Sequence, residues 1–325
     1  MKKGQNNMSD KNSAIYTAKN RSIKGANRTW SFSEIAALII FAVCAMAAVA
    51  AVIAITVYMF IKGTPAFFKA GVGEILFGRV WEPAAQNPQF GIFYVILTSI
   101  VGTALAILIG VPPAILTAVF LAEVAPKKLA AAVKPAIDLL AGIPSVVYGL
   151  LGIMILNPLM YKLELAIFKD SPTHTFTGGA NLISAVLVLA VMILPTVINI
   201  SQSSLKAVEP QLKAASLGLG ASKIQTIFRV QIPAAKSGII TAVVLGIGRA
   251  LGEAMAISFV SGNSVNIPLP FNSVRFLTTA IVSEMGYSEG LHRQVLFSIG
   301  LVLFIFIMIV NTVLSRLLKK EEKNV

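Results

Sequence analysis

Cysteine, histidine and charge are all scarce in this sequence. Its 325 residues include one cysteine, Cys44, and two histidines, and only 13% of the residues are charged, against about 25% in an ordinary soluble domain. A single cysteine excludes a disulfide-stapled fold, and the low charge excludes a disordered chain. Hydrophobic residues make up 56% of the chain, more than a soluble monomer of this length can bury. The composition therefore indicates an integral membrane protein.

Motifs of several enzyme classes are also missing. There is no GxxxxGK[ST] phosphate-binding loop, so the chain is not expected to bind ATP by that route. His174 and His292 fall in or beside predicted outward-facing loops, and neither belongs to an HExxH pair. The 14 acidic residues are scattered through loops and tails. We expect no covalent catalysis, no metal and no cofactor, and we interpret Cys44 as a small buried apolar side chain.

Apolar residues occur in blocks long enough to cross a membrane, which takes about 20 residues as a helix. Six blocks qualify: Glu34 to Lys62, about Gly91 to Glu123, Asp138 to Lys162, about Leu182 to Ile200, Ser237 to Gly262, and Arg293 to Arg316. Pro112 and Pro113 are expected to kink the second helix. Pro144 is expected to cause either a backbone break or a packing kink in the third. The predicted fold class is all-α, with six transmembrane helices.

The positive residues predict how these helices are oriented. With the N-terminus in the cytoplasm, 19 lysines and arginines fall in inside segments and 6 in outside loops. This asymmetry predicts a multi-pass protein of the plasma (inner) membrane with both termini cytoplasmic. We attribute the net charge of +13 to anionic lipid headgroups or a soluble partner rather than to nucleic acid. Residues 1–33 are predicted to be a basic, disordered tail, 34–62 the first span and 63–90 an extracytoplasmic loop.

The cytoplasmic loop between the fourth and fifth spans has an unusual pattern. Leu212 and Leu219 have helical spacing, Gly218 and Gly220 interrupt the helix, and Pro233 precedes the next span. A short helix that ends at glycine and is held by two spans suits a lever that docks on a soluble partner. A surface helix at the membrane interface fits the same spacing, so the pattern leaves both interpretations open.

Arg249 and Glu253 are the charged residues within the fifth block. A charge near the bilayer centre costs about 2.5–3.5 kcal/mol, so it normally faces protein or water. At i, i+4 spacing the two should share a helix face, and Gly248 and Gly252 should let another helix approach closely on the adjacent face. Arginine also suits an oxyanion such as phosphate. We favour a translocation or gating role for this pair and for Asp138. The alternative is a bracing salt bridge, of which Asp138 would be the third member.

The cytoplasmic loop resembles that of the permeases of binding-protein-dependent ABC importers. In that family Glu-Ala-Ala, three residues, glycine, nine residues and Ile-x-Leu-Pro recur; here Gly220 takes the glycine position and residues 230–233 the closing one. The family's glutamate is absent. The resemblance implies a MetI-like (type I importer) bundle with a coupling helix at about 209–222 that fits a groove on a separate ATPase. The residues it implies for this contact are Ala214, Ala215, Ser216, Leu217, Gly218, Leu219, Gly220 and Ala221.

Other stretches resemble the PstC family of phosphate-importer permeases. They are Trp81-Glu-Pro83 with Phe90-Gly-Ile92, residues 141–149, and residues 248–255 with 272–280. This resemblance implies import of inorganic phosphate, a permease core at 91–318 with a cytoplasmic C-terminus at 319–325, and a transport role for Arg249 and Glu253. It also implies partners: a PstA-like second permease, a dimeric PstB-like ATPase and an extracytoplasmic PstS-like binding protein, in addition to membrane lipid.

Three alternatives remain at this point. A permease for another oxyanion, such as sulfate or molybdate, would share the same features. A secondary transporter or channel would tend to show more midplane ionisable residues and a duplicated half. An integral-membrane enzyme would need clustered His, Asp or Glu near an interface, which the sequence does not supply.

Overall fold

The computed structural model describes residues 32–322, and the chain divides into two compact units at Val57 and Tyr58. The described part of the first unit is the beginning of helix α2 (Phe32–Ala70), and no residue of the most apolar window of α2 is buried. Cys44 is exposed, so the expectation of a buried side chain was wrong. In hydrocarbon a thiol on an outward face still behaves as a small apolar group. The predicted tail lies outside the described residues except for Phe32 and Ser33, as do residues 323–325.

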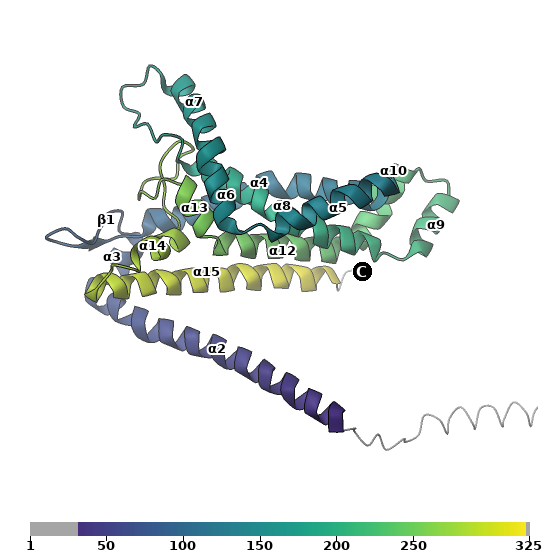
Figure 1. Cartoon of the computed structure of the whole chain (residues 1–325), viewed down its shortest axis with the longest axis horizontal. Helices are drawn as coiled ribbons and strands as arrows, with labels where there is room; N and C mark the ends of the chain where they lie inside the picture. Colours follow the sequence, from purple (N-terminus) through teal and green to yellow (C-terminus); the bar gives the residue numbers. More distant parts are fainter. Residues whose placement is uncertain (1–31, 323–325) are drawn as a thin grey trace, which may run out of the picture. The chain divides into compact units, whose positions relative to one another are not determined.

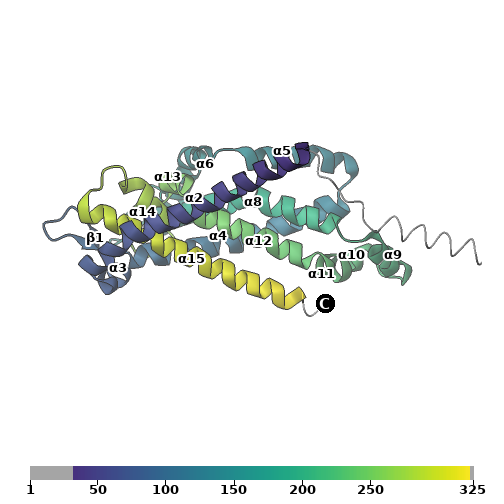
Figure 2. The same ribbon diagram turned by 90° about the horizontal axis from the view of Figure 1, so that it is seen from below.

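The second unit is a bundle of helices that run side by side (Figures 1 and 2). Its centre is formed by α4 (Phe93–Val119), α8 (Leu182–Lys206) and α12 (Lys236–Gly252), with α5 (Lys127–Gly142) packed on α8 and α15 (Gly290–Glu322) packed on α12. Two buried apolar clusters lie along α8. Small residues allow the close packing: a Cβ on Gly110 of α4 would lie 2.9 Å from the carbonyl oxygen of Ala190 on α8.

Shorter elements occupy the two ends of this bundle. One end carries α3 (Val72–Phe77), the antiparallel pair β1 (Trp81–Glu82) and β2 (Gln89–Phe90), α13 (Met255–Val260) and α14 (Leu277–Glu284). The other end carries the π-helical turn η1 (Phe120–Val124), α9 (Pro210–Gly218), α10 (Lys223–Thr226), the π-turn η3 (Ile227–Gln231) and α11 (Ile232–Ala234). Between α5 and α8 the chain forms α6 (Ser145–Leu151), the π-turn η2 (Gly152–Leu156) and α7 (Asn157–Phe168). Figure 1 shows α7 projecting away from the other helices.

The described residues contain five helices long and apolar enough to cross a membrane, and six if one bent pair counts as a single span. The bent pair joins residues 223–234 to α12 at an angle of 68°. The predicted fold class, an all-α integral membrane bundle, is confirmed. The predicted loop 63–90 contains more structure than expected, because α2 continues to Ala70 and is followed by α3 and the β1–β2 pair.

The third and fifth predicted spans differ in their bounds. The third does not begin at Asp138: residues 127–142 form the separate helix α5, and the apolar span is Ser145–Phe168. The break falls at Ile143, which is extended because a proline disfavours helical backbone in the residue before it. The fifth does not run to Gly262, because α12 ends at Gly252 and Glu253 is extended.

Prolines inside helices have different surroundings. Pro112 and Pro113 lie inside the continuous helix α4, and the kink expected there stays a prediction.

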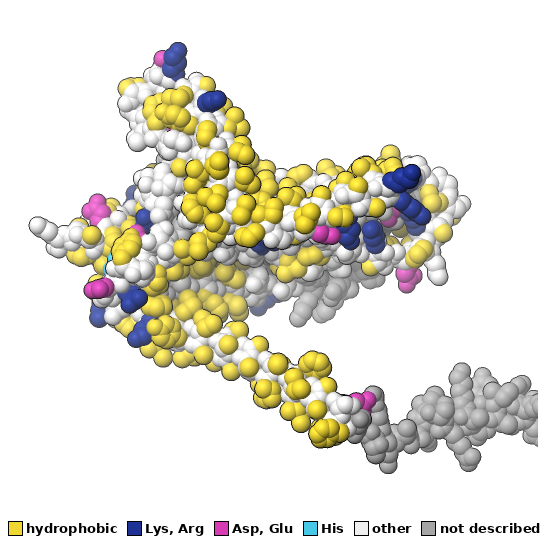
Figure 3. All heavy atoms as spheres, viewed as in Figure 1, with side chains coloured by type: hydrophobic (Ala, Val, Ile, Leu, Met, Phe, Trp, Pro, Cys, Tyr) yellow, Lys and Arg dark blue, Asp and Glu magenta, His cyan; other side chains and the backbone are white. Residues whose placement is uncertain are grey.

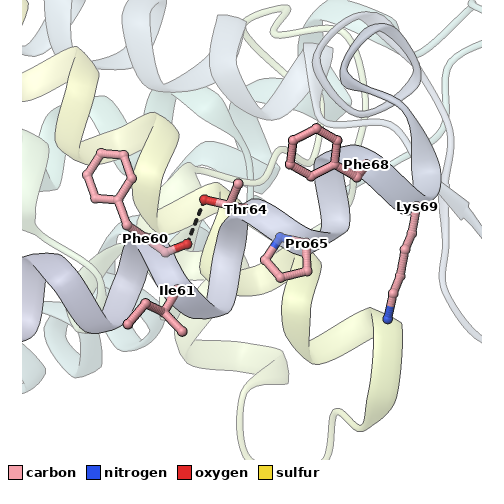
Figure 4. Close-up of a pocket in the computed structure, with 6 residues that line it drawn as sticks. All are labelled: Phe60, Ile61, Thr64, Pro65, Phe68 and Lys69. Carbon is pink, nitrogen blue, oxygen red and sulfur yellow. Dashed lines mark hydrogen bonds between the residues drawn. The ribbon is translucent and has the colours of Figure 1, made fainter.

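Pro65 lies inside α2, where the Thr64 hydroxyl donates a hydrogen bond to the carbonyl oxygen of Phe60 at 2.6 Å (Figure 4). These residues border a recess of about 520 Å³ on the surface of that one helix, lined mainly by apolar side chains.

Candidate translocation and coupling sites

Arg249 lies half-buried in the last turn of α12, on the side that faces α8. Its Nη1 donates a hydrogen bond to the Thr196 hydroxyl of α8 at 3.2 Å. Across residues 32–322 no carboxylate forms an ion pair with this guanidinium. A guanidinium has five N–H donors, so most of them remain available to a ligand or another subunit.

Glu253 lies beyond the end of that helix rather than one turn along it. Its Oε1 accepts a hydrogen bond from the backbone N–H of Ala256 at 2.9 Å, which caps the start of α13. Its carbonyl oxygen accepts a second bond from the Thr278 hydroxyl of α14 at 2.6 Å. The expectation that Arg249 and Glu253 share one helix face was wrong, because the backbone becomes extended at Glu253.

Asp138 is also outside any direct contact with Arg249. It is exposed on α5, and its Oδ1 accepts a hydrogen bond from Asn199 of α8 at 2.8 Å. Thr196 and Asn199 are three residues apart and so lie on one face of α8. The structure therefore attaches Arg249 and Asp138 to neighbouring positions of the same helix without joining them into the bracing salt bridge of the alternative interpretation.

The close helix crossing expected at Gly248 and Gly252 is not formed within the described chain. A Cβ added to either would meet none of its atoms within 4 Å. The tight crossing occurs instead between α6–η2 and α13, where a Cβ on Gly149 would lie 3.0 Å from Cα of Ala256. A Cβ on Gly152 would lie 2.4 Å from a Val260 methyl group. The open face of α12 is thus free for a different partner.

Helix α9 corresponds to the predicted coupling helix. It runs from Pro210 to Gly218, and no residue of it is buried. Gly220 has φ +85°, a conformation that glycine adopts without strain, so this residue ends the helix. All eight residues from Ala214 to Ala221 are therefore in or directly after a short, outward-facing helix, with Leu219 90% exposed. An exposed apolar residue at a helix end suits contact with another protein.

Two side-chain contacts that the sequence interpretation missed hold α9 in place. Lys213 of α9 forms an ion pair with Glu123, whose side chain is 8% exposed in η1 at the end of α4. The hydroxyls of Ser216 and Thr226 lie 3.0 Å apart and join α9 to α10. Glu123 closes a long charge-free stretch, and Lys213 falls on the same predicted side of the membrane. The opposite charges of these two residues, on the same predicted side of the membrane, were the signal from which the contact could have been predicted.

Both histidines bind buried carboxylates at the other end of the bundle. His292 lies 2.7 Å from Glu284, which also accepts a hydrogen bond from the Trp81 indole and pairs with Arg275. His174 lies 2.8 Å from Glu164. These contacts anchor the β1–β2 segment and the loop after α7. In the described part of the chain no group of three or more His, Cys, Asp or Glu could hold a metal.

Residues 114–323 match the family described as the binding-protein-dependent transport system inner membrane component. The chain belongs to this family. Its relatives include the probable ABC transporter permease YqgH of Bacillus subtilis, 38% identical over 87% of this chain and 91% of that protein. The phosphate transport permease PstC of Haemophilus influenzae is 34% identical over 76% of this chain and 80% of that protein.

A solved structure shares the fold. A chain of the bacterial alginate ABC transporter, in complex with a periplasmic protein that holds an alginate pentasaccharide, superposes with a TM-score of 0.59. The match covers 90% of this chain and 99% of that one at 16% identity. Together with the family membership, this likeness confirms the predicted MetI-like permease bundle.

Proposed function

We propose that this chain is a permease subunit of an ATP-driven importer of inorganic phosphate, forms half of the translocation pathway and catalyses no covalent chemistry itself. The observation that carries the proposal is Arg249: a half-buried guanidinium beside the open face of α12, bonded to one neutral hydroxyl. A planar guanidinium fork binds an oxyanion through two charge-assisted hydrogen bonds. The relatives named as phosphate transport permeases support phosphate over sulfate or molybdate.

The likeness to permeases named PstC supports a specific set of partners. A PstA-like second permease would cover the open side of α12, a dimeric PstB-like ATPase would bind α9, and a PstS-like binding protein would deliver phosphate at the opposite end. The lysines and arginines of the loops support a membrane orientation with both termini and α9 in the cytoplasm. The family's description as an inner membrane component supports a location in the plasma (inner) membrane.

The contacts of α9 suggest how ATP hydrolysis by the partner would move the bundle. A displacement of α9 is passed to the end of α4 through the Lys213–Glu123 pair. It is passed to α12 through the Ser216–Thr226 contact and the bent segment 223–234. Because α4 and α12 both pack on α8, this displacement can switch the bundle between inward-open and outward-open states. Arg249 lies where α12 meets α8 and would face the anion in one of them.

The experiment is phosphate uptake by Arg249→Gln in membrane vesicles that contain the whole transporter. Loss of a charge-assisted hydrogen bond costs about 1.5–3 kcal/mol, so we expect uptake to fall roughly tenfold to a hundredfold. Arg249→Lys should be intermediate because it keeps the charge without the fork. Arg293→Gln, an exposed position at the start of α15, is the matched control. Uptake of phosphate at the normal rate by Arg249→Gln, with an intact complex, would contradict the proposal. Uptake of sulfate instead of phosphate by the wild type would show that sulfate is the substrate.

A further inference from the structure

A cavity of about 350 Å³ lies between η1, α5 and α8, at the end of the bundle that carries α9. Small side chains make up much of its lining. Four alanines from η1, from α5 and from the residues between them line it: Ala122, Ala125, Ala130 and Ala131. The volume is within the range of about 300–1,000 Å³ typical of small-ligand sites. None of the residues assigned above to translocation or coupling lines this cavity.

Three lysines from two helices surround the cavity. Lys127 and Lys134 are seven residues apart on α5, so they lie on the same side of that helix. Lys206 is the last residue of α8. Among the described residues none of the three has a carboxylate partner, and the adjacent acid, Glu123, is paired with Lys213. Lysines and arginines gather at this end of α5 in the space-filling view (Figure 3).

Gln202 of α8 adds a buried polar group to the same wall. It is 2% exposed and lines the cavity, where the N–H groups of its side-chain amide are available as hydrogen-bond donors. The first turn of α5, which begins at Lys127, also presents unpaired backbone N–H groups and the positive end of the helix dipole. All of these groups favour a negatively charged ligand with several acceptor oxygens.

We propose that this cavity binds a phosphate group, presented either by the headgroup of an anionic phospholipid or as free inorganic phosphate. Lysine ammonium groups bind phosphate as point charges, and basic pockets between spanning helices on the cytoplasmic side bind lipid headgroups. The bound group offsets part of the positive charge of the three lysines and supplies acceptors for Gln202. It also ties the start of α5 to the end of α8, next to the η1 turn that contacts α9.

The test measures binding to the purified, complete transporter by native mass spectrometry, with phosphatidylglycerol and with phosphatidylcholine as separate probes. The test variant is Lys127→Gln/Lys134→Gln, and the matched control is Lys128→Gln, which lies on the same helix but outside the cavity lining. We expect the double variant to bind phosphatidylglycerol at least about fivefold more weakly than the wild type. The control and the phosphatidylcholine complexes should be unchanged. Equal thermal unfolding midpoints establish that the double variant is folded.

A second arm separates the two sources of the phosphate group. Inorganic phosphate is added to the wild type carrying phosphatidylglycerol, and its direct binding is measured by isothermal titration with and without Gln202→Ala. If inorganic phosphate does not displace the bound phosphatidylglycerol, the cavity binds a lipid headgroup. If it does displace the lipid, and Gln202→Ala binds inorganic phosphate more weakly, the cavity binds free phosphate. Inorganic phosphate is also titrated into the double variant, and unchanged binding of both phosphatidylglycerol and inorganic phosphate there would overturn the proposal. So would an equal loss in Lys128→Gln, because that result indicates diffuse surface charge.

Discussion

Two pairs of glycines in this protein have similar spacing and opposite surroundings. Gly149 and Gly152 are pressed against α13, so that an added Cβ would collide with Ala256 or Val260. Gly248 and Gly252 face open space in the described chain. Glycine spacing identifies a helix face that another element can approach, but it does not identify that element. For the first pair the partner is the chain itself; for the second we propose that it is another subunit.

The largest effect is expected for Gly149→Val. Three added carbon atoms would collide with the backbone of Ala256, which cannot move without shifting α13. Overpacking of this kind costs about 1–3 kcal/mol, and a backbone neighbour favours the upper end. Thermal unfolding in detergent should show a clearly lowered midpoint. Gly248→Val is the control with the same change of residue, and an equal loss in both variants would show that the two pairs do not differ in packing.

Gly248→Leu tests the other half of the comparison. The isolated chain should keep its stability or gain slightly, since leucine is a better helix former than glycine by about 1 kcal/mol. The assembled transporter should lose the second permease, because a leucine would occupy the face that we assign to that subunit. Co-purification of the tagged chain measures this. Full recovery of the second permease would place the subunit interface elsewhere.

The ion pair between Lys213 and Glu123 is a contact within this chain, as is the packing of Gly149 and Gly152 against α13. Lys213→Glu and Glu123→Lys should each reduce uptake several-fold, because each puts like charges together in a partly buried contact. The double exchange should recover much of the activity, since it restores opposite charges. Uptake is compared with ATP hydrolysis in the same vesicles. If the double variant performs no better than the single ones, the pair does not transmit movement from α9.

The smallest effect is expected at Glu253, the residue directly after Gly252. Glu253→Ala removes the acceptor for the Ala256 N–H, and losing such a cap costs about 1 kcal/mol. Glu253→Gln keeps an oxygen acceptor and should be nearly neutral in thermal unfolding. An equal cost for both variants would indicate that the carboxylate charge matters, which would restore the interaction with Arg249 that its i, i+4 spacing first suggested.

The sequence predicted the parts of this protein that depend on local chemistry. The apolar blocks predicted six spans, and residues 32–322 contain up to six candidate spans when the bent segment is counted with α12. Gly218 and Gly220 were expected to interrupt the helix of the cytoplasmic loop; α9 ends at Gly218, and Gly220 follows in a backbone conformation suited to glycine. The error in the fifth span falls where a helix ends for tertiary reasons. Glu253 stops α12 because its side chain caps α13 and its carbonyl accepts from Thr278.

By itself, the sequence determined that the chain crosses a membrane several times, since about 20 apolar residues in a row have no other stable environment. It also determined which family the cytoplasmic loop resembles. Only the tertiary structure decided which glycines are packed, that Arg249 meets Thr196 rather than a carboxylate, and that Lys213 reaches Glu123 from 90 residues away. The physical reason is that spacing along one helix fixes a face, whereas the neighbour of that face is chosen by how all the helices pack together.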